Sequence, residues 1–243
     1  VSYYKEAIAL AKKHGVPIVL DPVGCHAGAY RLSVVLDLLK TGAISLLRGN
    51  QSETKAIYDA LSSDTKEAAS TLGKGVDGAQ VADSAVTAYR LARLINCPVV
   101  ATGEEDYVSD GTRVFAVPHG HPIMTAVTGT GCLLGAVLAA FFSAYYPCKD
   151  RLSIGEFLAY ALAYYGLAGE SAVQVSGVQP GSFSVAFMDS LYTLDDAVLI
   201  SENRIRPVVV PDQLQVYFIS GTQDVELNEN RLLSIVEDAC RGG

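Results

Sequence analysis

The residues best suited to chemistry lie in segment 127–132, VTGTGC, which we call the anion loop. It directly precedes an apolar stretch that favours a helix. Gly129 and Gly131 allow the backbone to approach a ligand closely, and the first N–H groups of the helix would point at that ligand. The positive end of the helix dipole would stabilise an anion, such as a phosphoryl group in transfer. A tight turn is the simpler interpretation of a GxG pattern alone. The chain contains no GxxxxGK[ST] pattern, which excludes the P-loop fold.

Cys132 closes the anion loop and would lie in the first turn of the helix. A helix N-terminus stabilises a thiolate relative to a thiol. Such a thiolate could accept a proton from a substrate hydroxyl as a general base. The alternative is a small residue that only packs against the loop.

A second motif, NxxE, is formed by Asn50 and Glu53. Asn at this place favours a helix N-cap, and Glu three residues later is the spacing of a capping box. The functional alternative is a carboxylate that holds Mg²⁺, mostly through water, near phosphate groups.

Polar residues also follow three predicted strands, namely Asp21, Arg48 and Thr102. In an open parallel sheet the ligand crevice lies outside the carboxyl ends of the strands. One such residue could simply cap a helix, but three together predict a shared site.

The elements that must position these residues alternate between short apolar runs and helical stretches. This alternation favours a parallel sheet with helices on both faces. Strands are predicted at 16–20, 43–47 and 98–101, a hairpin at 107–115 and a polar surface excursion at 62–80; helices are predicted at 3–14, 31–40, 83–95, 133–146, 154–175 and 183–194.

The composition and net charge limit the partners and the compartment expected for this protein. Half of the 243 residues are hydrophobic, which supports a large core. The net charge of −8 argues against a nucleic-acid partner, because no basic stripe is present. The five cysteines show no CxxC pair, which disfavours disulfides and zinc and indicates a reducing cytoplasm. The apolar run 132–146 is shorter than the ~20 residues of a membrane span, so no membrane partner is expected.

Seven short segments, taken in order, resemble the hydroxyethylthiazole kinase family. They are 19–24 (VLDPVG), 48–53 (RGNQSE), 74–77 (KGVD), 102–107 (TGEEDY), 119–125 (HGHPIMT), 127–132 (VTGTGC) and 180–183 (PGSF). The resemblance covers roughly residues 1–205. It implies a ribokinase-like α/β fold, with a mostly parallel central sheet flanked by helices on both faces. It also implies phosphorylation of the hydroxyl of 5-(2-hydroxyethyl)-4-methylthiazole in thiamine salvage or biosynthesis, with ATP as co-substrate and Mg²⁺ as cofactor.

The resemblance also implies roles for the strand-end residues. Arg48, Thr102 and Asn50 match ATP-contacting positions. Asp21 and Glu53 match the acidic residues that organise Mg²⁺ and the phosphates.

The same resemblance assigns the catalytic group to Gly129, Thr130, Gly131 and Cys132, with Gly129 also contacting the thiazole. Most ribokinase-like enzymes place Asp where Cys132 stands, and thiazole kinases carry Cys there. The family further implies a homotrimer with active sites between subunits.

Three other functions stay open. A hydroxymethylpyrimidine kinase or an ATP-dependent repair dehydratase would share the fold, but either would be expected to lack Cys132. A catalytically inactive module that binds ATP or thiazole is the third.

The two ends of the chain lead to further expectations. Val1 already lies in a helical pattern, so part of the kinase domain is expected to precede it. The kinase domain is predicted at 1–206 and a linker at 207–213. Residues 214–243 resemble the opening strand and helix of the thiamine-phosphate synthase TIM barrel. This predicts a bifunctional kinase–synthase, and a plain extension is the alternative.

Overall fold

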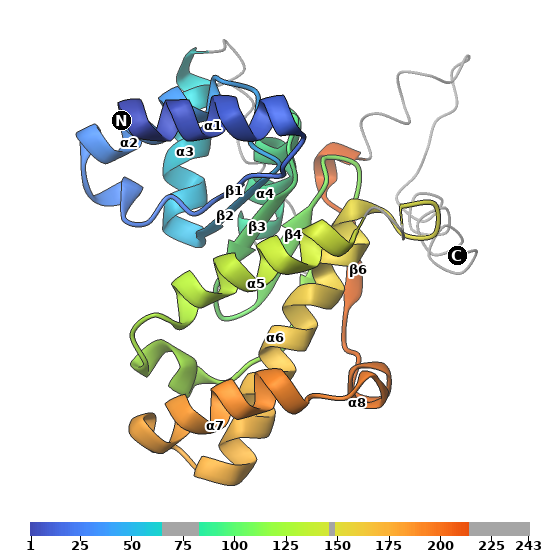
Figure 1. The fold of residues 1–243 in the computed structure, drawn as a ribbon. Coiled ribbons are helices and arrows are strands. Elements are labelled where there is room, and N and C mark those ends of the chain that lie inside the picture. Colours follow the sequence, from blue (N-terminus) through green and yellow to red (C-terminus); the bar gives the residue numbers. More distant parts are fainter. Residues whose placement is uncertain (65–82, 146–148, 214–243) are drawn as a thin grey trace, which may run out of the picture. The chain divides into compact units, whose positions relative to one another are not determined.

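The computed structural model describes residues 1–64, 83–145 and 149–213 (Figure 1). The chain divides into two compact units, Val1–Val210 and Pro211–Gly243, and residues 211–213 are the described part of the second. The first unit holds a six-stranded sheet covered by helices. This arrangement confirms the predicted α/β class.

The sheet has the strand order β1-β2-β3-β4-β5-β6. The pairs β1–β2 and β2–β3 are parallel and the other three are antiparallel, so β1, β2, β3 and β5 run in one direction. The predicted mostly parallel sheet is confirmed in this sense, and the carboxyl ends of these strands lie at one edge. The strands are β1 Val19–Leu20, β2 Leu46–Asn50, β3 Val99–Thr102, β4 Asp106–Ser109, β5 Val114–Val117 and β6 Arg206–Val208.

Most helices agree with the predicted ones except at a few ends, and of α3 only the N-terminal cap had been predicted. α5 begins at Thr130, three residues before the prediction, and the short helix α8 and the 3₁₀ turns had not been predicted. The helices are α1 Ser2–His14, α2 Ala29–Leu39, α3 Gln51–Asp64, α4 Asp83–Ile95, α5 Thr130–Ala144, α6 Ile154–Ser176, α7 Pro180–Thr193 and α8 Asp196–Ser201, with 3₁₀ turns η1 Cys25–Ala27 and η2 Pro122–Ala126.

Two hydrophobic clusters cover the two faces of the sheet. Successive side chains of a strand point to opposite faces. Leu46 and Val100 accordingly pack with α5, α6 and α7, whereas Leu47 and Ala101 pack with α2, α3 and α4. The predicted helical layer on each face is therefore present (Figure 1).

The end of the first unit differs from the prediction. Pro207 pairs with Phe115 and Val208 with Val114, so the predicted linker at 207–213 begins too early, inside β6. The compact unit continues to Val210. The predicted surface excursion lies mostly within 65–82, outside the described residues, as does the predicted synthase-like segment 214–243.

Candidate active site

Three strands bring Asp21, Arg48 and Thr102 together at the shared carboxyl edge. Val19, Leu46 and Val100 face α5. Successive side chains of a strand point to opposite faces of the sheet, so every second residue shares a face. The residues two positions later are therefore on the same face. Arg48 Nη1 donates to Asp21 Oδ2 at 3.2 Å, and Arg48 Nη2 donates to Thr102 Oγ1 at 3.1 Å. The structure thus places these predicted site residues side by side.

The charges and unpartnered polar atoms of this group favour the binding of a polar ligand. Burial raises the pKa of Asp21, the Arg48 guanidinium opposes this, and the charge of Glu53 adds to it. Within the described ranges, the buried Asp21 Oδ1 and Arg48 Nε have no hydrogen-bond partner. Unpartnered buried polar atoms are costly, so their presence at a strand edge indicates a place where a polar ligand binds.

The anion loop lies against this group. Gly129 has a φ of 101°, a left-handed conformation that favours glycine, and the first helical bond of α5 runs from Leu133 N to Gly129 O at 2.8 Å. The N–H groups of Gly131 and Cys132 precede that bond and are available to a ligand. A Cβ placed on Gly131 would lie 3.4 Å from Arg48 Nη2. A cationic side chain and the positive end of a helix therefore border the same space.

Side-chain hydroxyls fix the conformation of the anion loop. Thr130 Oγ1 donates to the carbonyl oxygen of Met124 at 2.7 Å, with the Val127 carbonyl at 3.1 Å. Tyr165 of α6 donates its hydroxyl to the Thr130 carbonyl at 2.5 Å. Cys132, the third residue of α5, is exposed. Its thiol is therefore accessible from solvent in the first turn of the helix.

Asn50 and Glu53 form a reciprocal capping box at the start of α3. Glu53 N donates to Asn50 Oδ1 at 2.9 Å, and Asn50 N donates to Glu53 Oε2 at 2.8 Å. Glu53 Oε1 accepts from Gly24 N at 2.8 Å, so the carboxylate also holds the loop after β1. Glu53 is buried and both of its oxygens bind backbone N–H groups.

The two carboxylates, Asp21 and Glu53, differ in how well they fit Mg²⁺. Mg²⁺ in phosphoryl-transfer enzymes binds through one or two carboxylates together with phosphate oxygens and water. Asp21 fits this role because Oδ1 is unpartnered, whereas Glu53 could act only through water or its charge. The part of the chain that the structure describes holds no group of three or more His, Cys, Asp or Glu that could bind a metal alone. Phosphate oxygens would have to complete the shell.

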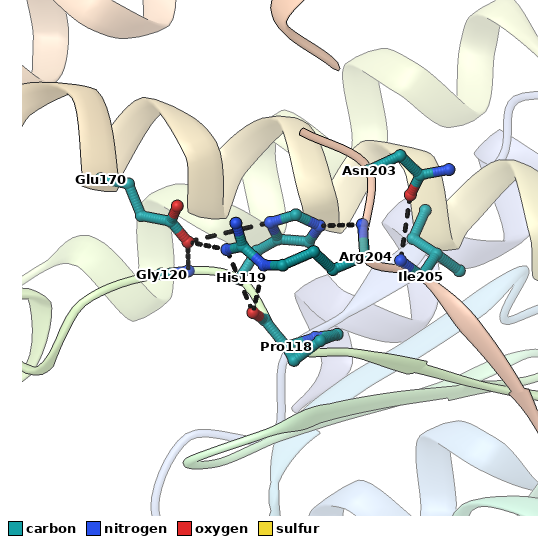
Figure 2. Close-up of polar contacts among 7 residues, drawn as sticks. All are labelled: Pro118, His119, Gly120, Glu170, Asn203, Arg204 and Ile205. Carbon is teal, nitrogen blue, oxygen red and sulfur yellow. Dashed lines mark hydrogen bonds and ion pairs between the residues drawn. The ribbon is translucent and has the colours of Figure 1, made fainter. Parts of the chain in front are cut away.

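A polar cluster that the sequence analysis missed fixes the chain before the anion loop (Figure 2). Glu170 of α6 accepts from Gly120 N at 2.8 Å and pairs with the Arg204 guanidinium. The side chain of His119 is buried, and its Nε2 accepts from Arg204 N at 3.2 Å. Burial lowers the pKa of His119, as does the charge of Arg204, and Glu170 opposes them. His119 therefore serves as a neutral acceptor. The available signal was Glu170, a charged residue within the apolar stretch that follows the first turn of α6.

Two glycines of α6 allow residues 119–124, which precede the anion loop, to lie directly on that helix. A Cβ on Gly166 would come within 2.5 Å of the His119 Cβ, and one on Gly169 within 2.6 Å of the Met124 sulfur. At Gly166 a Cβ would also meet backbone atoms of His119 and Gly120, so only glycine fits there without displacement of the chain, whereas at Gly169 the Met124 side chain would have to move. Met124, whose carbonyl oxygen accepts the hydrogen bond from the Thr130 hydroxyl, is thus packed against α6.

Comparisons with known proteins identify the family of this chain. The profile of the hydroxyethylthiazole kinase family matches residues 1–197. The chain belongs to this family. A hydroxyethylthiazole kinase of Streptococcus agalactiae serotype Ia is 44% identical over 200 residues, covering 82% of this chain and 73% of that protein. One from Moorella thermoacetica is 40% identical over 206 residues, covering 83% and 71%.

A solved structure supports the same assignment. A hydroxyethylthiazole kinase protein of Pyrococcus horikoshii OT3 matches with a TM-score of 0.68 and 32% identity, covering 84% of this chain and 70% of that one. The predicted hydroxyethylthiazole kinase family and its fold are therefore confirmed, and ATP as co-substrate follows from the kinase family. No helix in the described ranges has the length and apolar character that crossing a membrane requires. The roles of individual residues remain predictions.

Proposed function

We propose that the chain transfers the γ-phosphoryl group of ATP to the hydroxyl of 5-(2-hydroxyethyl)-4-methylthiazole at this edge of the sheet. The observation that carries the proposal is the placement of the Arg48 guanidinium. It lies between Asp21 and Thr102 and directly against Gly131 at the start of α5. Phosphoryl transfer needs mainly positioning and neutralisation of charge, which a cation beside a helix N-terminus supplies.

The residues take distinct parts in this reaction. Arg48 and Thr102 bind ATP, with Asn50 at the neighbouring strand end. The N–H groups of Gly131 and Cys132 stabilise charge on the transferring group, and Gly129 contacts the thiazole. Cys132 acts as the general base for the substrate hydroxyl as the new O–P bond forms, the bond from the γ-phosphorus to its bridging oxygen breaks and ADP leaves. With these roles, the phosphoryl group passes directly from ATP to the alcohol, without a covalent enzyme intermediate.

We also propose that Mg²⁺ binds with ATP through Asp21, with Glu53 acting through water. When bound, Mg²⁺ supplies charge neutralisation on the phosphate oxygens. Asp21 contributes a carboxylate oxygen, and Arg48 keeps that carboxylate in place. Glu53 holds the backbone of the loop after β1, which fixes the position of Asp21.

The substrate is tested with two alcohols assayed in parallel. Product masses after incubation with Mg-ATP are compared for hydroxyethylthiazole and hydroxymethylpyrimidine. Phosphorylation of the thiazole alone supports the proposal. Phosphorylation of the pyrimidine alone would favour the alternative kinase, and ATP binding without transfer to either alcohol would favour a binding module.

Three further properties belong to the proposal. We expect a cytoplasmic homotrimer, which analytical ultracentrifugation tests through its mass. We also propose that residues 214–243 begin a thiamine-phosphate synthase barrel. In support, the family match ends at residue 197 and the first compact unit ends at Val210. A polypeptide whose following sequence lacks repeated strand–helix units, or which makes no thiamine phosphate from the two precursors, would contradict this.

A further inference from the structure

The side chain of Tyr165 connects the middle of α6 to the anion loop. Its hydroxyl donates to the carbonyl oxygen of Thr130 at 2.5 Å. Its buried ring packs edge-on against Phe187, with centroids 5.0 Å apart and an interplanar angle of 85°, and Phe187 stacks on Phe183. The ring is therefore held in one orientation by the core, and the hydroxyl is held with it.

The Thr130 carbonyl belongs to the same peptide group as the Gly131 N–H. A trans peptide is planar, and its C=O and N–H point in opposite directions. No cis peptide occurs in the described residues. A hydrogen bond that fixes the direction of the carbonyl therefore also fixes the direction of the N–H at the other end. A strong donor on the oxygen polarises the peptide and makes its N–H a better donor.

The surroundings of the Gly131 peptide match this arrangement. Gly131 lies beside Arg48, and its N–H precedes the first helical bond of α5. Burial raises the pKa of Tyr165, the Arg48 charge opposes this, and Cys132 adds to it. The phenol therefore stays protonated as a donor at neutral pH. Arg48 and Cys132, which both affect the pKa of Tyr165, are two of the residues assigned to the reaction.

We propose that Tyr165 is a positioning residue for phosphoryl transfer, acting through the Thr130–Gly131 peptide. Its hydroxyl orients and polarises that peptide, so that the Gly131 N–H donates to the transferring phosphoryl group. The inference rests on the proposed function of the anion loop. Because the N–H acts mainly on charge that develops in the transition state, Tyr165 contributes to kcat more than to substrate binding.

The chain provides a matched control in the preceding residue. Tyr164 also lies on α6, and its hydroxyl also donates to a backbone carbonyl, that of Leu191 in α7. Tyr164→Phe removes the same kind of hydrogen bond without touching the anion loop. Tyr165→Phe keeps the ring that packs on Phe187, so the core is retained.

The first test compares the steady-state kinetics of Tyr165→Phe, Tyr164→Phe and the unchanged chain. For Tyr165→Phe we expect kcat to fall by about 10-fold, with KM for ATP and for hydroxyethylthiazole within about twofold. For Tyr164→Phe we expect kcat within about twofold of the unchanged chain. Equal kcat values for the two variants, or a loss confined to KM, would overturn the inference.

The second test does not require turnover. In protein labelled with ¹⁵N-glycine, Tyr165→Phe should shift the Gly131 amide resonance, and Tyr164→Phe should leave it in place. An unmoved Gly131 resonance in Tyr165→Phe would show that the hydroxyl does not control the peptide. If the unchanged chain phosphorylated no thiazole, the proposed function would fail, and the role in transfer would fail with it. The amide comparison would still separate that failure from an error in the geometry.

Discussion

Arg48→Met is the most informative single change, because Arg48 is the buried cation at the centre of the site. Its guanidinium pairs with Asp21 at 3.2 Å, and the two side chains are only 10% and 19% exposed. Methionine fills a similar volume but leaves the Asp21 carboxylate buried without a counter-charge. We expect the variant to lose both stability and ATP-dependent activity.

The magnitude follows from the burial of the pair. Removing one partner of a buried ion pair costs about 3–5 kcal/mol, and the partial exposure of Asp21 places this pair near the lower end, at about 3 kcal/mol. For a domain of this size, each kcal/mol shifts Tm by about 2–4 °C. Thermal unfolding followed by circular dichroism, without ATP, should therefore show Tm lower by about 6–12 °C.

The pH dependence of this loss distinguishes charge from packing. The folded pKa of Asp21 is raised, so the carboxyl contributes stability below its ordinary value of 3.8 and loses it as the pH rises through the folded pKa. Arg48 lowers that pKa, so its removal raises the folded pKa further. The difference in Tm between the unchanged chain and Arg48→Met should therefore widen as the pH rises from the ordinary value of 3.8 through the folded pKa of Asp21.

Two results would refute this reasoning. One is a Tm difference that stays constant across the pH range, because a packing defect does not titrate. The other is additivity in the double variant Arg48→Met/Asp21→Asn. Residues in direct contact should couple, so we expect the double variant to lose less stability than the sum of the single changes.

Three other perturbations test separate parts of the site. Cys132→Ala should lower kcat by about 100-fold if the thiolate is the base, and a kcat within about twofold would exclude that role. Glu53→Gln places an amide opposite one of two backbone N–H donors and should lower the free energy of unfolding by about 1–3 kcal/mol, measured in urea. An unchanged urea midpoint would contradict the capping geometry. His119 has a lowered pKa, so its stabilisation is present above its ordinary value of 6.5 and is lost as the pH falls. His119→Asn, which can still accept from Arg204 N, should flatten the fall of Tm below that pH, and an equally steep fall would show that another group titrates.

The strand-end site could be predicted from the sequence because its cause is local. Apolar runs identify β1, β2 and β3, and the polar residues after them must share an edge if the strands are parallel. The capping box of Asn50 and Glu53 is likewise set by a spacing of three residues. The distances that join Asp21 to Arg48 required the structure.

Other features could not be predicted because their causes are distant or the local signals conflict. α5 starts at Thr130 and not at Leu133, since two glycines favour a turn until the helix and its neighbours are present. The strand β6 contains Pro207 and is only three residues long, so pairing with β5 alone determines it. Tyr165 resembles an ordinary core aromatic, and its partner Thr130 lies 35 residues away.

The glycines of α6 also have a consequence for the order of folding. Gly166 and Gly169 each lower the intrinsic helix propensity by about 1 kcal/mol relative to alanine, so the middle of α6 is weak as an isolated helix. It gains contacts once His119 and Met124 pack against those glycines. We therefore expect this stretch of helix and the loop that leads to Thr130 to become ordered in one cooperative step. An intermediate with a finished α6 and an unformed anion loop should not accumulate.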